Sequence, residues 1–228
     1  MKPAPCIAIV GAESTGKTSL AQALALHLTE MTGLRCAFVP EVLREWCDER
    51  GRTPRAEEQQ AIAHEQSRRI AQARHGHELV VADTTALMTA VYSELLFADT
   101  SLYAMALEAH RDYALTLLTA LDLPWTPDGL QRDGPHVREP VDRTVRQALL
   151  RAGLQWSVVA GQGQARLGAA LDALTPLLLT LQPPRAGLFT RLQARQAALP
   201  EWQWVCEKCD APECEHRSLK GWAGGPDQ

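Results

Sequence analysis

The sequence predicts an α/β fold in which crossover helices connect a parallel sheet. Short apolar and β-branched runs alternate with longer helical stretches along the chain. A glycine-rich loop joins the first apolar run to the first helical stretch. With 228 residues, the chain is long enough for one α/β domain with an appendage, or at most two small domains. A net charge of −4 with interspersed signs gives no basic stripe for nucleic acid. No apolar run approaches the roughly 20 residues that span a bilayer, so we expect neither nucleic-acid nor membrane partners.

Five strands and seven helices are expected. The strands should lie near residues 5–10, 35–39, 78–82, 114–120 and 154–159, where the apolar runs are short. The helices should lie near residues 17–31, 42–50, 56–74, 85–96, 101–110, 138–152 and 163–182. Ligands of open parallel sheets bind beyond the carboxyl ends of the strands, so functional residues should follow Val10, Val39, Ala82 and Ala120.

The first strand runs directly into a phosphate-binding motif. Gly11-Ala12-Glu13-Ser14-Thr15-Gly16-Lys17-Thr18 matches G-x-x-x-x-G-K-[ST] and opens the helical segment that begins at Ser19. The backbone N–H groups of such a turn and the positive end of the helix dipole converge on a triphosphate. We expect this loop from Gly11 to Ser19 to bind ATP, with Lys17 reaching the β- and γ-phosphates and the Thr18 hydroxyl binding Mg²⁺.

Two acids follow the neighbouring strands. Asp83 closes the run of residues 78–82, where an acid can hold Mg²⁺, or can cap the following helix, or both. Glu41 follows the second strand and is a candidate base or hydroxyl-orienting group. Alternatively, Glu41 only starts the next helix through favourable contact with its dipole. Arg44, one turn later, can contact phosphate or pair with Glu41 or Asp48.

The segment from Trp125 to Arg146 has the composition of a lid. Proline and glycine at its start are followed by basic residues on a predicted helix. Arginines on a lid stabilise the transferring phosphate, and we regard Arg132 and Arg138 as catalytic candidates. Nearby acids offer the alternative that these arginines, together with Arg143 and Arg146, are neutralised surface charges. The acids are Asp133, Glu139 and Asp142.

At this point the chain resembles the ribosylnicotinamide kinase domain of NadR-type proteins, within the P-loop kinase superfamily. The resemblance covers roughly residues 5–182. Besides the phosphate loop, the resemblance rests on five segments. They are Val39-Pro40-Glu41-Val42-Leu43-Arg44-Glu45, Ile62-Ala63-His64-Glu65-Gln66, Asp83-Thr84-Thr85-Ala86-Leu87, Tyr92-Ser93-Glu94 and Pro124-Trp125-Thr126-Pro127-Asp128-Gly129-Leu130.

The resemblance implies a P-loop three-layer fold with a five-stranded sheet of order 2-3-1-4-5. It also implies ATP-dependent phosphorylation of the 5′-hydroxyl of nicotinamide riboside, which gives nicotinamide mononucleotide for NAD supply. Asp128 matches the lid, whereas Thr85 stands where many members carry a second acid. The chain begins at the kinase strand, so we expect neither the DNA-binding nor the adenylyltransferase domain of multifunctional members.

Three aromatic residues lie near the predicted mouth of the site. Trp46, Tyr92 and Trp125 are candidates to attract the cationic pyridinium ring. The alternative, which is the commoner role of such aromatics, is that each packs in the core or at its rim, and the sequence assigns no stacking partner. A kinase of another nucleoside or small metabolite would share the same loop, acids and lid. A non-catalytic, regulatory NTP-binding module is an alternative from another class.

A composition change after Gln182 separates an expected kinase domain, residues 1–182, from a tail, residues 183–228. In the tail, Cys206, Cys209, Cys214 and His216 form the pattern C-x₂-C-x₄-C-x-H, which suits structural Zn²⁺. The alternative is a flexible tail with incidental thiols. Because the first strand begins within a few residues, we expect no signal peptide, a cytoplasmic location and reduced thiols. Cys6, Cys36 and Cys47 should then be small core residues. The sequence gives no oligomeric state.

Overall fold

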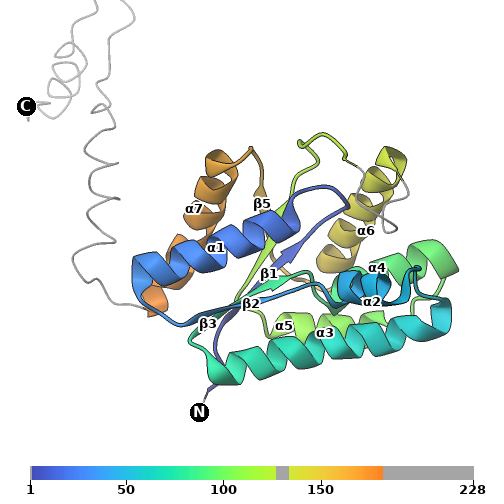
Figure 1. Ribbon diagram of the computed structural model, residues 1–228, viewed down its shortest axis with the longest axis horizontal. Helices are drawn as coiled ribbons and strands as arrows, with labels where there is room; N and C mark the ends of the chain where they lie inside the picture. The colour runs from blue at the N-terminus through green and yellow to red at the C-terminus, as the bar shows by residue number, and fades with distance from the viewer. Residues whose placement is uncertain (1, 127–133, 182–228) are drawn as a thin grey trace, which may run out of the picture. The chain divides into compact units, whose positions relative to one another are not determined.

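The fold is a five-stranded parallel sheet with helices on both faces (Figure 1). The structure is a computed structural model that describes residues 2–126 and 134–181. The strands are β1 (Cys6–Val10), β2 (Cys36–Val39), β3 (Leu79–Asp83), β4 (Leu115–Thr119) and β5 (Ser157–Val159). The helices are α1 (Lys17–Thr32), α2 (Val42–Arg50), α3 (Ala56–Gly76), α4 (Ala86–Phe97), α5 (Tyr103–Arg111), α6 (Arg138–Arg151) and α7 (Gln164–Leu181), with a short 3₁₀ helix, η2 (Pro135–Val137), before α6.

The strand order is β2-β3-β1-β4-β5, and every pairing is parallel, which confirms the expected order. Strands β1 and β3 are buried at every position because both of their faces are covered. This explains why both read as continuous apolar runs in the sequence. The register pairs Ile9 of β1 with Asp83 of β3, so the end of β3 lies beside the loop that follows β1.

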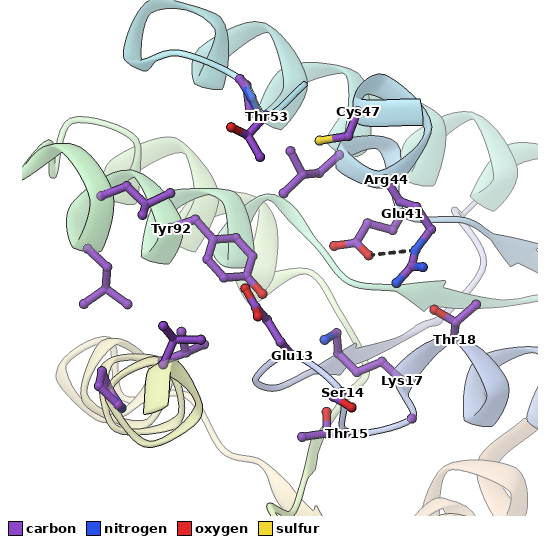
Figure 2. Close-up of a pocket in the computed structure, with 18 of the residues that line it drawn as sticks. Glu13, Ser14, Thr15, Lys17, Thr18, Glu41, Arg44, Cys47, Thr53 and Tyr92 are labelled. Atoms are coloured by element: carbon purple, nitrogen blue, oxygen red, sulfur yellow. Dashed lines mark ion pairs between the residues drawn. The ribbon is translucent and has the colours of Figure 1, made fainter. Parts of the chain in front are cut away.

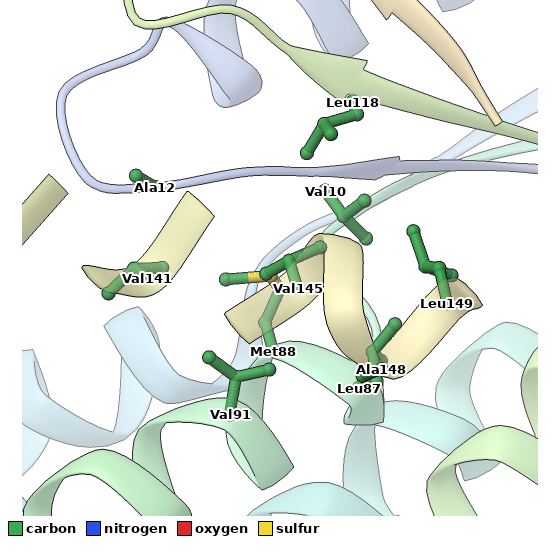
Figure 3. Packing of buried hydrophobic residues seen from close by; sticks show 10 residues of the cluster. All are labelled: Val10, Ala12, Leu87, Met88, Val91, Leu118, Val141, Val145, Ala148 and Leu149. Atoms are coloured by element: carbon green, nitrogen blue, oxygen red, sulfur yellow. The ribbon is translucent and has the colours of Figure 1, made fainter. Parts of the chain in front are cut away.

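Helices α1 and α7 cover one face of the sheet, and α3, α4, α5 and α6 lie on the other (Figure 1). The core between the sheet and helices α4 and α6 is aliphatic (Figure 3). Its buried members are Val10, Ala12, Leu87, Met88, Val91, Leu118, Val141, Val145, Ala148 and Leu149. Ala12 belongs both to this core and to the phosphate loop, so packing against α6 fixes one side of the loop.

The predicted elements are confirmed with boundary shifts of up to three residues. The largest shift is in β5, which begins at Ser157 rather than at residue 154. Gly153, with φ 67°, ends α6, and the N–H of Leu154 donates to the carbonyl of Leu149 at 3.0 Å. Leu154 therefore completes the end of a helix instead of starting a strand.

Cys6 and Cys47 are buried, Cys36 is half-buried, and all three are free thiols, as expected. Over the described ranges, no helix is both long enough and apolar enough to cross a membrane. The proposed zinc ligands Cys206, Cys209, Cys214 and His216 lie outside the described residues, so the zinc site stays a prediction. The domain boundary at residue 182 stays a prediction as well.

Candidate active site

The loop after β1 has the backbone geometry of a phosphate cradle. Gly11 and Gly16 have φ values of 146° and 74°, and Ser14 adopts φ 54°. A Cβ on Gly11 would lie 2.2 Å from the Thr119 hydroxyl oxygen, so only glycine fits where β1 ends against β4. The loop passes directly into α1, whose first residue is Lys17. Its N–H groups and the helix N-terminus therefore serve one anion site.

Buried polar contacts fix the loop from behind. The Thr15 hydroxyl lies 2.7 Å from that of Thr119. Arg166, at the start of α7, is 4% exposed and donates to the carbonyl of Thr15 at 2.6 Å and to that of Gly161 at 2.7 Å. The same guanidinium forms an ion pair with Asp122, which also accepts the Gly161 N–H at 2.6 Å. Arg166 thus connects the loop to the ends of β4 and β5. The sequence did not predict this role for Arg166. The one feature that could have indicated it is that Arg166 is a lone arginine in an otherwise largely apolar helix.

Lys17 lies at the centre of the charged groups of the site. Its Nζ donates to the carbonyl of Ala12 at 2.8 Å, and its side chain is buried. Burial lowers the pKa of Lys17, while the surrounding carboxylates of Glu41, Asp83 and Glu13 raise it. A cation held among three acids and the loop backbone is positioned to meet the negative charge of a phosphate chain.

Asp83 fits a divalent cation. Its side chain is 1% exposed, and Oδ1 has no hydrogen-bond partner among the described residues. Burial raises the pKa of Asp83, whereas a hydrogen bond from Thr18 and the charge of Lys17 lower it. A buried carboxylate oxygen with an unused lone pair beside a threonine hydroxyl is the donor set that Mg²⁺ prefers. Thr18 and Asp83 are therefore the residues that could hold it.

The alternative role for Asp83, capping α4, is taken by Thr85. The Thr85 hydroxyl accepts from the Leu87 N–H at 3.3 Å. Thr85 is also 3.3 Å from Nδ1 of His110, whose Nε2 lies 2.9 Å from the Thr116 hydroxyl. Burial lowers the pKa of His110 to about 4, so the imidazole is neutral at pH 7. Thr85 thus belongs to a buried polar network, and it is not among the residues lining the cavity described below.

Glu41 is the residue before α2, but its side chain makes no capping hydrogen bond. Gln66 of α3 caps that helix instead. Its Oε1 accepts the Val42 N–H at 2.8 Å, and its Nε2 donates to Pro40 at 3.2 Å. This leaves the Glu41 carboxylate facing Arg44, at 3.7 Å, and the positive charge of Lys17. Burial raises the pKa of Glu41, and Lys17 and Arg44 oppose that shift.

One cavity of about 520 Å³ is lined by Lys17, Thr18 and Glu41 together (Figure 2), while Asp83 lies outside its lining. Its phosphate end comprises residues 13–19, including Glu13, Ser14 and Ser19. Glu41, Arg44 and Cys47 line it from the α2 side, and Tyr92 points into it from α4. The remaining wall is largely apolar and comes from several elements. It includes Leu43, Pro54, Leu95, Leu96, Val137, Pro140 and Val141. The cavity therefore combines a phosphate site, a buried carboxylate and a mainly apolar compartment.

Five expected site residues in the described part of the chain do not line this cavity. Gly11 lies behind the loop and Asp83 beside Thr18, as described above, and the other three are Trp46, Trp125 and Arg138. The Trp46 ring is contacted by the guanidinium groups of Arg50, at 4.9 Å, and Arg52, at 4.8 Å. Trp125 is half-buried. Arg138 is buried and donates to the carbonyl of Leu123 at 2.8 Å. Arg138 therefore supports the segment after β4. The roles first expected for these three residues gain no support from their placement.

Arg143 and Arg146 of the expected lid do not line the cavity either. Arg146 pairs with Asp142 at 2.7 Å, which agrees with the alternative of neutralised charges, and Arg143 is exposed. Asp128 and Arg132 lie outside the described residues, so their roles stay predictions. Of the three aromatic candidates, Tyr92 alone is brought to the cavity.

Comparison with known proteins agrees with this geometry. The model of the AAA domain family matches residues 6–166, which contain all five strands and the phosphate loop. The chain belongs to the AAA domain family. No curated protein matches the sequence.

Solved structures similar to this AAA domain share its fold. A NadR protein in complex with NAD and AMP-PNP matches 76% of the chain and 49% of its own, at 20% identity and a TM-score of 0.59. A NadR protein in complex with NR matches 76% of the chain and 50% of its own, at 18% identity and a TM-score of 0.62. Thymidylate kinase from Ehrlichia chaffeensis matches 77% of the chain and all of its own, at 13% identity and a TM-score of 0.55. The chain spans about half the length of the NadR chains, and the expected resemblance to their P-loop domain is confirmed for the fold.

Proposed function

We propose that the protein is an ATP-dependent kinase that phosphorylates the 5′-hydroxyl of nicotinamide riboside. The observation that carries this proposal is the continuity of one cavity from the phosphate loop, past Glu41, to an apolar compartment. ATP would place its phosphates on the loop and its γ-phosphate near Lys17. The NadR structures, which hold NR in one case and AMP-PNP in another, support this pair of ligands.

Phosphoryl transfer requires positioning and charge stabilisation rather than covalent work by the protein. Lys17 would neutralise charge on the β- and γ-phosphates, and its burial strengthens that interaction by excluding water. Thr18 and Asp83 would hold Mg²⁺, which supplies further charge neutralisation on the phosphates when bound. Glu41 would accept a hydrogen bond from the attacking hydroxyl and orient it toward the γ-phosphate.

The acceptor would occupy the compartment beyond Glu41. Tyr92 and the leucines of α4 give an aromatic and aliphatic surface that suits a pyridinium ring. Leu95 and Leu96 both line the cavity and are 41% and 56% exposed, so their side chains are accessible to a ligand. A flat heteroaromatic ring attached to ribose would cover this surface and leave its primary hydroxyl near Glu41.

The test is a panel of acceptors incubated with ATP and Mg²⁺ and scored for both ADP and a phosphorylated product. The panel contains nicotinamide riboside, the common nucleosides and thymidine monophosphate, the last because of the thymidylate kinase fold. We expect nicotinamide riboside to be turned over fastest. Rapid turnover of another acceptor without turnover of nicotinamide riboside would refute the substrate assignment. ATP hydrolysis or binding without any phosphorylated acceptor would refute the kinase assignment.

A further inference from the structure

Gln59 is a buried polar residue in the wall of the cavity that no step above uses. It lies in the first turn of α3 and is 1% exposed. The residue lines the cavity, and its buried Oε1 has no hydrogen-bond partner among the described residues. Leaving a buried amide oxygen unpaired costs free energy, so such a group in a ligand cavity points to a bond that a ligand completes.

The position of Gln59 on α3 places it away from the reacting end. Gln66 lies seven residues later on the same helix face and bonds to the backbone on both sides of Glu41. Seven residues correspond to about 10.5 Å along the helix axis. Gln59 is therefore displaced from the level of Glu41 along α3, and an acceptor whose hydroxyl meets Glu41 can reach Gln59 with its distal end.

The surroundings of Gln59 are fixed by an ion pair at the start of α3. Glu58 accepts two hydrogen bonds from the Arg52 guanidinium, both at 2.7 Å, and one from the Arg55 N–H at 2.8 Å. These contacts hold the loop that contributes Thr53 and Pro54 to the cavity wall. An amide held beside such a fixed loop can discriminate between ligands by hydrogen bonding, because it has little freedom to adjust.

We propose that Gln59 is a specificity-determining residue whose Oε1 accepts a hydrogen bond from an N–H donor on the ring end of the acceptor. This inference rests on the proposed function and deepens it. The carboxamide of nicotinamide riboside supplies such a donor, whereas the carboxylate of nicotinic acid riboside has acceptor oxygens only. The acid analogue would leave Oε1 unpaired and bring a second acceptor against it, so the site selects the amide.

The experiment measures kcat/KM for both ribosides with ATP and Mg²⁺ in the wild type, in Gln59→Met and in Gln60→Met. Methionine keeps the length of glutamine and removes both hydrogen-bonding groups, and Gln60 is an exposed neighbour on the same helix. We expect the wild type and Gln60→Met to prefer the amide by about 10-fold or more. We expect Gln59→Met to lose most of that preference through a higher KM for nicotinamide riboside.

A second measurement separates this role from a structural one. If Oε1 is unpaired until a ligand binds, then in the absence of a riboside Gln59→Met should unfold at the same temperature as the wild type or at a higher one. A lower unfolding temperature would show that the amide stabilises the fold and would overturn the inference. Equal turnover of both ribosides by the wild type, or preference for the acid, would also overturn it while leaving the proposed kinase intact. Turnover of neither riboside would overturn both proposals.

Discussion

Replacing Arg166 by methionine tests whether a buried guanidinium supports the phosphate loop. The change removes hydrogen bonds to two carbonyls, those of Thr15 and Gly161, and the ion pair with Asp122. Removing one partner of a fully buried ion pair costs about 3–5 kcal/mol. The side chain of Asp122 is 35% exposed and can be rehydrated, so we expect the lower end, about 3 kcal/mol. For a chain of this size, that loss lowers the unfolding temperature by about 6–12 °C.

The assay is thermal and urea unfolding, followed by circular dichroism and interpreted with a matched control. Arg111→Met removes an exposed ion pair with Glu108, 3.0 Å long, and should cost less than about 1 kcal/mol. A double-mutant cycle with Asp122→Asn should give a coupling energy on the order of 1–2 kcal/mol. An Arg166→Met protein that unfolds within 1 °C of the control, roughly the effect of 0.5 kcal/mol or less, would refute the reasoning.

Three further predictions concern the site and the tail. Lys17→Ala should reduce turnover by about 10²-fold or more at saturating ATP, because it removes a preorganised charge, whereas exposed Lys2→Ala should not; wild-type turnover in Lys17→Ala would contradict the role. Because burial raises the pKa of Glu41, the folded protein binds its proton more readily than an exposed glutamate would. In the pH profile of kcat/KM, the midpoint of the acid limb should therefore lie above the ordinary pKa range of glutamate. This limb should vanish in Glu41→Gln but not in exposed Glu49→Gln. An unchanged limb in Glu41→Gln would exclude this carboxylate as the titrating group. Metal analysis of reduced protein should find about one zinc per chain, lost in Cys206→Ser or Cys209→Ser and kept in Cys36→Ser; protein without zinc would disprove the tail site.

The sequence by itself determined the fold class and the phosphate end of the site. A buried parallel strand must be apolar throughout, and a loop that cradles phosphate needs glycine at fixed positions. Both requirements are local, so the motif from Gly11 to Thr18 and the acid Asp83 at the end of the next strand could be read directly. The same local rules predicted the helices to within a few residues.

Only the tertiary structure decided which side chains meet in the cavity. Trp46 appeared suited to a ligand ring, yet Arg50 and Arg52 contact its ring. Arg166 and Gln59 carry no motif, and their roles depend on partners, or on a missing partner, brought near by folding. The sequence left it open whether Glu41 caps a helix, and a glutamine 25 residues away does so instead. Burial and long-range hydrogen bonding depend on how the helices pack on the sheet, which residue order alone does not specify.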